Sequence, residues 1–219
     1  MTVFLILVAA VALVALIVYV SNSKSKEEVN RYKEKQSNDS INNNHEWVDL
    51  GLPSGTKWAV CNVGANKPED LGFYFAWGET RTKSVFNKST YNYLSSSIML
   101  PAKADAATIN WGTDWHIPSK NDFEELCHNC IYKWTTKNGV SGGLFIGSNG
   151  NSIFLPAAGA KRENCQIGKG DWGYYWMNSL YDNSNKYAKN LYFKSDVCGG
   201  GHANLEYGFS VRPVCSKIN

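Results

Sequence analysis

The chain has 219 residues, of which 43% are hydrophobic and 19% are charged, and its formal net charge is +3. Enough apolar side chains are present to build a core, so the composition excludes a disordered chain. The small, dispersed charge is no electrostatic footprint for DNA or RNA, so we expect no nucleic-acid partner. An aromatic content of 13% favours short strands and packed rings over a coiled coil or helical bundle.

The N-terminal segment is strongly apolar. Residues 3–20 contain no charged side chain, and a helix of that length would be about 27 Å long, close to the hydrocarbon core of a bilayer. Residues 1–20 are therefore predicted to form a transmembrane helix or signal anchor. An uncleaved anchor is favoured over a cleaved export signal, because no Lys or Arg precedes the apolar stretch.

Residues 21–45 are rich in Ser, Asn, Lys, Glu and Gln, which predicts a polar stalk. Their basic side chains favour a cytoplasmic location for the rest of the chain under the positive-inside rule, because none precedes the apolar stretch. The six cysteines favour the opposite orientation, outside the cytoplasm. We give the cysteines, together with the family resemblance described below, the greater weight.

Residues 46–219 are predicted to form one α+β domain with mostly antiparallel strands. A weak helix is expected over 103–109, and a stronger one begins after Ser119, where Asp122 completes an N-terminal capping pattern and Phe123 and Leu126 repeat on one face. Frequent glycines separate short apolar runs, which predict strands over 57–63, 73–77, 143–146, 152–155, 188–193 and 209–214.

Several segments of this domain resemble a known family in their order along the chain. They are 46–65 (EWVDLGLPSGTKWAVCNVGA), 75–79 (FAWGE), 111–119 (WGTDWHIPS), 149–159 (NGNSIFLPAAG) and 208–215 (GFSVRPVC). This set resembles the Fibrobacter succinogenes major paralogous domain, a family abundant in Bacteroidota surface proteins. The resemblance implies a C-type lectin-like domain, within the superfold shared with formylglycine-generating enzymes, with paired terminal strands and one long loop region for binding.

Two covalent features are expected if the domain is exported. Cys61 and Cys215, near the first and last strands, are expected to lie close enough for a disulfide. Asp39-Ser40-Ile41 is similar to the Bacteroidota signal for O-glycosylation, which makes Ser40 the candidate acceptor. Six cysteines allow fifteen pairings, so the residues alone fix none of them.

Catalytic and metal motifs are weak. Cys127 and Cys130 form a CxxC that could be combined with Cys165, Cys198 or His202 into a zinc site, but structural disulfides are favoured because no second CxxC or HxxxH is present. The chain has no Gly-x-Ser-x-Gly elbow, and its four histidines lie far apart. We therefore expect no enzyme, no cofactor and no metal.

A recognition surface is expected between residues 161 and 206, where rings alternate with amides as in adaptable binding loops. The candidate ligand-binding residues are Trp172, Tyr174, Asn178, Tyr181, Asp182, Asn183 and Asn185. The expected protein is a membrane-anchored, non-enzymatic cell-envelope binder of a glycan or protein, tethered through residues 3–20. Two alternatives stay open: a pilin-like subunit that self-assembles through its apolar helix, although Leu5 stands where pilins carry Glu, and a diversified receptor-binding protein of retroelement-target type.

Overall fold

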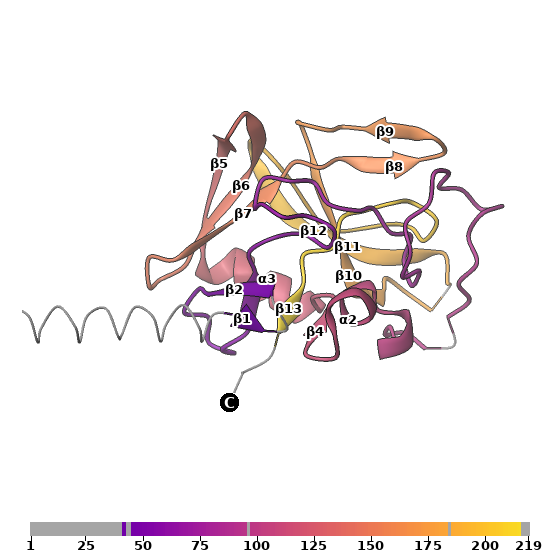
Figure 1. Ribbon diagram of the computed structural model, residues 1–219, viewed down its shortest axis with the longest axis horizontal. Coiled ribbons are helices and arrows are strands. Elements are labelled where there is room, and N and C mark those ends of the chain that lie inside the picture. Colours follow the sequence, from indigo (N-terminus) through magenta and orange to yellow (C-terminus); the bar gives the residue numbers. More distant parts are fainter. Residues whose placement is uncertain (1–40, 43–44, 96, 184, 216–219) are drawn as a thin grey trace, which may run out of the picture. The chain divides into compact units, whose positions relative to one another are not determined.

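The computed structural model describes residues 41–42, 45–95, 97–183 and 185–215 (Figure 1). The chain divides after Ile41, and the architecture below is that of the unit that begins at Asn42. Strand residues account for 41% and helical residues for 11% of the described chain. The fold is mostly β, so the expected α+β class, and with it the expected C-type lectin-like arrangement, is corrected.

A five-stranded sheet brings the two ends of this unit together. Its order is β1 (Ile41–Asn42), β2 (His45–Asp49), β3 (Lys57–Ala59), β13 (Val214–Cys215) and β4 (Trp115–His116). β13 is antiparallel to both of its neighbours, with Val214 opposite Trp58 on one side and His116 on the other. The expected pairing of the strand that begins at Lys57 with the C-terminal strand is confirmed.

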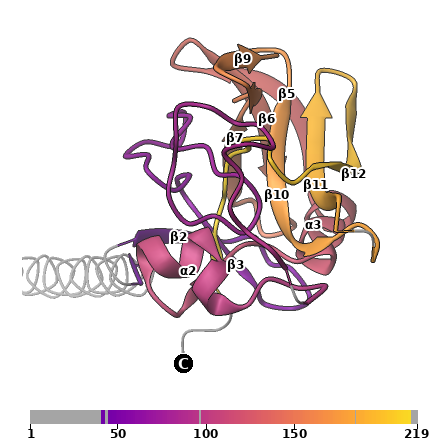
Figure 2. The same cartoon turned by 90° about the vertical axis from the view of Figure 1, so that its right-hand side faces the viewer.

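Two antiparallel three-stranded sheets and one hairpin make up most of the remainder. The first sheet contains β5 (Ile131–Lys137), β6 (Val140–Ile146) and β7 (Ser152–Pro156), and the second contains β10 (Gly173–Leu180), β11 (Tyr187–Lys194) and β12 (Val197–Asn204). Figure 2 shows β10, β11 and β12 side by side. The hairpin of β8 (Ala160–Arg162) and β9 (Cys165–Ile167) lies at the upper right of Figure 1.

Three short helices follow the irregular first half of the domain: η1 (Ala102–Ala104), α2 (Ala106–Trp111) and α3 (Lys120–Asn129). α3 begins as predicted, because the Ser119 hydroxyl accepts from the Asp122 amide at 3.2 Å while the Asp122 carboxylate accepts from the Ser119 amide at 2.8 Å. The weaker helix starts later than expected. The Asp105 carboxylate accepts from the amides of Ala107 and Thr108, so α2 begins only after this cap.

The sheet β10-β11-β12 has two different faces. On the first, called here the helix face, Tyr175, Leu191 and Phe193 are buried against Phe123 and Leu126 of α3. On the second, called the groove face, Trp176 is buried in another core cluster, and Tyr174 and Tyr192 are only half-buried. Alternation along each strand produces this separation, since successive side chains point to opposite faces.

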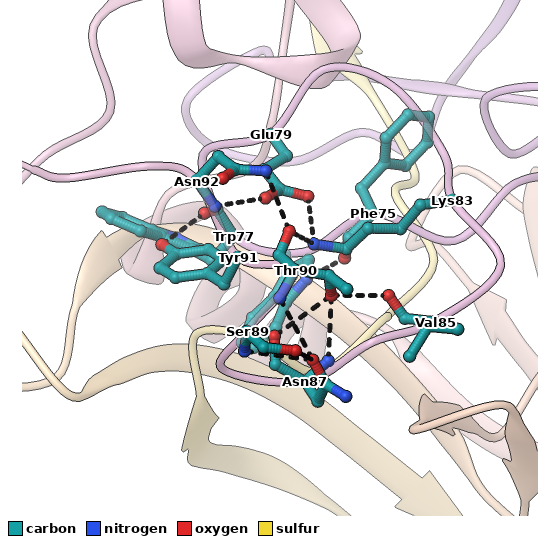
Figure 3. Close-up of polar contacts among 11 residues, drawn as sticks. Phe75, Trp77, Glu79, Lys83, Val85, Asn87, Ser89, Thr90, Tyr91 and Asn92 are labelled. Atoms are coloured by element: carbon teal, nitrogen blue, oxygen red, sulfur yellow. Dashed lines mark hydrogen bonds and ion pairs between the residues drawn. The ribbon is translucent and has the colours of Figure 1, made fainter.

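Residues 75–92 contain little regular structure and are held by polar contacts (Figure 3). The Lys83 ammonium lies 2.7 Å from the Glu79 carboxylate and donates to the Thr90 carbonyl at 2.8 Å. The Glu79 carboxylate also accepts from the Asn92 amide at 2.9 Å, and the Tyr91 hydroxyl donates to the Trp77 carbonyl at 2.8 Å. The predicted strand over 73–77 is reduced to a bridge between Phe75 and Phe209.

Arg212 is a fully buried cation that connects distant parts of the chain. Its guanidinium donates to the Asn62 side chain at 2.8 Å, to the carbonyls of Ala59 and Val60 at 3.0 and 2.6 Å, and to the carbonyl of Phe154 at 3.0 Å. Burial lowers the pKa of this guanidinium. The hydrogen bonds compensate the cost of removing the charge from water.

The expected transmembrane helix over residues 3–20 and the candidate acceptor Ser40 lie outside the described residues. Within the described ranges, no helix has both the length and the apolar character needed to cross a bilayer. A transmembrane helix is therefore not part of the fold described here, and strands β1 and β2 already begin inside the expected stalk of residues 21–45.

Candidate functional site

A groove of about 610 Å³ lies on the groove face of the sheet β10-β11-β12. One side is formed by the β8–β9 hairpin and the other by β12 and the segment that follows it. Rings dominate its lining, which consists of Ala160, Arg162, Ile167, Trp172, Tyr174, Asn190, Tyr192, Gly200, Gly201, His202, Ala203, Tyr207 and Phe209. A cavity of this size and character is typical of small-molecule sites.

The rings of the groove continue a stack that starts in the core. Trp176 and Phe209 are buried and stack with a centroid separation of 4.2 Å. Tyr174 stacks on Phe209 at 5.1 Å, and Trp172 lies parallel to Tyr174 within 10° at 5.8 Å. The two half-buried rings are thus held in place by buried ones. Ligand binding therefore costs less side-chain entropy, because these rings are already ordered.

Glycines keep the β12 side of the groove open. Gly199 and Gly201 pair with Tyr192 and Asn190 of β11, so their missing side chains would have stood on the groove face. A Cβ on Gly201 would lie 2.9 Å from Tyr192 Cδ1 and 3.0 Å from Asn190 Oδ1, whereas a Cβ on Gly200 would come near only Met177, on the helix face. The groove therefore exists in this form because position 201 carries no side chain.

Polar groups in and around the groove are few. Asn190 is 3% exposed, and its Oδ1 has no hydrogen-bond partner among the described residues. At the rim, the Arg162 guanidinium lies 5.5 Å from the centre of the Tyr207 ring, and the Lys194 ammonium lies 5.1 Å from that of Trp172. Burial, and to a lesser extent the neighbouring Tyr192, raises the pKa of the Tyr174 phenol, which is therefore a neutral donor at physiological pH.

The structure disperses the seven candidate ligand-binding residues. Trp172 and Tyr174 lie together in the groove. Tyr181 belongs to a second pocket on the helix face, where it stacks on His202 at 4.0 Å. Asn178 lies where the register between β10 and β11 shifts, and its Oδ1 is buried without a hydrogen-bond partner among the described residues.

The remaining three candidates follow β10. Asp182 and Asn183 are exposed, and Asn185 has a φ of 53° and donates from its side chain to the Ser95 carbonyl at 3.4 Å. None of the three lines the groove. Residues 161–206 form the hairpin β8–β9 and the three strands of a sheet rather than the expected long loop region, and the recognition surface expected on this stretch stays a prediction.

Sequence reasoning missed several groove residues, among them Arg162, Asn190, Tyr192 and Tyr207. Two signals were available. Residues 190–194 alternate between polar or amphipathic side chains (Asn190, Tyr192, Lys194) and apolar ones (Leu191, Phe193), as a strand with two different faces does. The three consecutive glycines of β12 are among those that separate the predicted strands, although a strand without side chains beside aromatic residues also indicates a close approach or an open cleft.

The cysteines do not pair as expected. Cys61 is a free thiol, so the expected disulfide between Cys61 and Cys215 is not formed in the structure. Instead, the two sulfur atoms that approach each other belong to Cys127 and Cys198, 3.4 Å apart. In the part of the chain that the structure describes, no group of three or more His, Cys, Asp and Glu side chains could hold a metal ion, so the zinc alternative has no geometric support.

Comparisons with known protein families, curated proteins and solved structures give no match. The similarity to the major paralogous domain is therefore a matter of short motifs in a common order, and it stays a prediction.

Proposed function

We propose that the unit beginning at Asn42 is a non-enzymatic recognition domain and that its groove binds a short glycan. The observation that carries this proposal is the parallel pair of Trp172 and Tyr174 in the groove that Asn190, with its buried and unpartnered Oδ1, also lines. Flat rings and a fixed hydrogen-bond acceptor are the two features that a sugar ring requires, because it has an apolar face and hydroxyl groups along its edge.

The stack supports this chemistry energetically. Trp172 and Tyr174 are anchored through Phe209 and Trp176, so ligand binding orders few new degrees of freedom. A hydroxyl donated to Asn190 Oδ1 would satisfy a buried acceptor, and an unsatisfied polar group of this kind costs about 1–3 kcal/mol. A ligand hydroxyl that reaches this atom would therefore add both affinity and orientation.

The size and lining of the groove favour a glycan over a protein ligand. A volume of about 610 Å³ suits a few sugar rings, whereas a protein partner needs a much larger and flatter surface. The lining residues include no carboxylate, while Arg162 contributes a cation. The groove is therefore suited to neutral glycans and to glycans that carry a carboxylate.

A cell-surface location remains part of the proposal. It is supported by the motifs shared with the major paralogous domain family of surface proteins, and a glycan ligand would be encountered there. The filament-subunit and diversified-receptor alternatives receive no support from the described residues.

The test is a glycan array probed with the full chain, followed by calorimetric titration of the sugars that bind. Replacing both Trp172 and Tyr174 by Ala is expected to weaken binding at least tenfold, since a stacked ring contributes about 1 kcal/mol or more. Tyr181→Ala, which removes a ring of the other pocket, is the matched control and should bind like the wild type. Equal affinity of the double variant, or capture of proteins but no glycan, would contradict the proposal.

A further inference from the structure

The helix face of the sheet β10-β11-β12 carries a close pair of thiols that the proposed function does not use. Cys127 lies on α3 and Cys198 on β12, separated by 71 positions in the sequence, and their Sγ atoms are 3.4 Å apart. Both are only partly exposed and lie in a pocket of about 490 Å³ between helix and strand. We infer that Cys127 and Cys198 form a redox-active dithiol whose oxidation to a disulfide fastens α3 to β12.

The geometry requires little movement. A disulfide has an S–S distance of about 2.05 Å, so the two sulfur atoms need to approach each other by roughly 1.3 Å. The neighbours of Cys198 on the β12 side do not obstruct this approach, because Gly199 and Gly200 have no side chains. A Cβ built on Gly200 would have Met177 Cε as its nearest neighbour, at 3.9 Å.

The nearby Cys130 is a poorer partner although it completes a CxxC with Cys127. Its side chain is buried in the core cluster that includes Leu126 and Trp58, and burial, reinforced by Cys127 and Glu125, raises its pKa to about 11. The hydrogen bond from the Cys198 thiol, in contrast, holds the pKa of Cys127 below its usual value. Cys127 is thus the thiol of this group that is best prepared to act as a nucleophile.

The reaction consumes a low-molecular-weight disulfide such as oxidised glutathione. The Cys127 thiolate attacks one sulfur of the oxidant, which breaks its S–S bond, releases one glutathione thiolate and leaves a mixed disulfide on Cys127. Cys198 then loses its proton and attacks the Cys127 sulfur, which releases the second glutathione. Two protein thiols are oxidised to one disulfide, and one glutathione disulfide is reduced to two thiols.

Oxidation would act on the strand that the two cavities share. Gly200, Gly201 and His202, which follow Cys198 on β12, line both the groove and the pocket on the helix face. A disulfide between Cys198 and Cys127 of α3 restricts the movement of β12. The redox state of the pair is therefore linked to the shape of both cavities. This inference goes beyond the proposed function and does not depend on glycan binding.

The test uses the full chain, fully reduced and then incubated with oxidised glutathione. The remaining thiols are alkylated in denaturant, and the protein is digested without reduction for mass spectrometry. We expect two of the six thiols to be lost in a single linked peptide pair that contains Cys127 and Cys198, and the link to disappear in Cys198→Ser. Cys165→Ser, which removes an exposed thiol of β9, is the matched control and should leave the link unchanged.

A second measurement on the wild-type chain needs no variant. The disulfide closes a loop of about 70 residues, so the oxidised form is expected to unfold about 10 °C above the reduced form, and reduction should reverse the shift. A dominant link between Cys127 and Cys130, mixed pairings, stable glutathione adducts without a link, or equal unfolding temperatures would each overturn the inference.

Discussion

The two faces of the sheet β10-β11-β12 belong to the same strands but differ in burial. On the helix face, Phe193 is fully buried among Tyr132, Phe145 and Tyr175, where its loss would leave a cavity. On the groove face, its neighbour Tyr192 is half-buried and stands at the edge of an open cleft. One strand thus contributes one set of alternate residues to the core and the other set to the lining of the groove.

The largest expected effect is the difference in free energy of unfolding between a substitution on the helix face and the same substitution on the groove face. Phe193→Ala is expected to lower the free energy of unfolding by about 3–5 kcal/mol, because it removes a large side chain from a packed core. Tyr192→Ala should cost about 1 kcal/mol or less, since its ring is partly in solvent already. Chemical denaturation of the two variants measures the difference. Equal losses would mean that both faces serve packing.

The next effect concerns ligand affinity. Gly201→Val would place its side chain against Tyr192 and Asn190, and we expect glycan affinity to fall at least tenfold, about 1.4 kcal/mol, without loss of fold. Gly200→Val projects toward Met177 on the helix face and should change affinity less than twofold. Titration of both variants with a ligand from the array distinguishes the faces. A stronger effect of the Gly200 variant would place the site in the other pocket.

A smaller loss of stability is expected when the N-cap of α3, the helix that covers the helix face, is removed. Ser119→Ala removes the N-cap of α3 and should lower the free energy of unfolding by about 1 kcal/mol. Ser195→Ala, at an exposed position between β11 and β12, is the control and should have no measurable effect. Glycan affinity should be the same in both variants. A loss of affinity in Ser119→Ala alone would show that α3 and the groove are coupled.

The smallest effect is a change in thiol reactivity with no change in fold. In the reduced chain, the alkylation rate of Cys127 should rise with a midpoint below the ordinary thiol pKa of 9.0, because the Cys198 thiol stabilises the thiolate by a hydrogen bond. Cys198→Ala removes that donor and should move the midpoint upward. Alkylation followed by mass spectrometry across pH measures both. A midpoint that is the same in Cys198→Ala would show that the hydrogen bond is not what lowers the pKa of Cys127.

Local signals in the sequence predicted local structure well. Ser119 and Asp122 located the start of α3, because a capping box depends only on residues within one turn. The strands predicted over 143–146, 152–155 and 188–193 lie within β6, β7 and β11, where apolar and β-branched residues stand between turns. In each of these elements the deciding interactions are close in sequence.

Pairing between distant segments explains the failures. Gly199 to Gly201 have low strand propensity, yet they form β12 because β11 offers a complete ladder opposite them. Trp172 and Tyr174, which line the groove, could be predicted as candidate residues from their rings and neighbouring glycines. The role of Asn190 depends on which face it occupies, and the register of the sheet decides that rather than the residue type.

The position of β13 has a consequence for how the protein is made. β13 lies between β3 and β4, and the Arg212 that precedes it bonds to Ala59, 153 residues earlier in the chain. During synthesis the edges of β3 and β4 that pair with β13 therefore stay unpaired until the ribosome has released residues 212–215. Such long-range closure makes folding slow and leaves the nascent chain prone to aggregation.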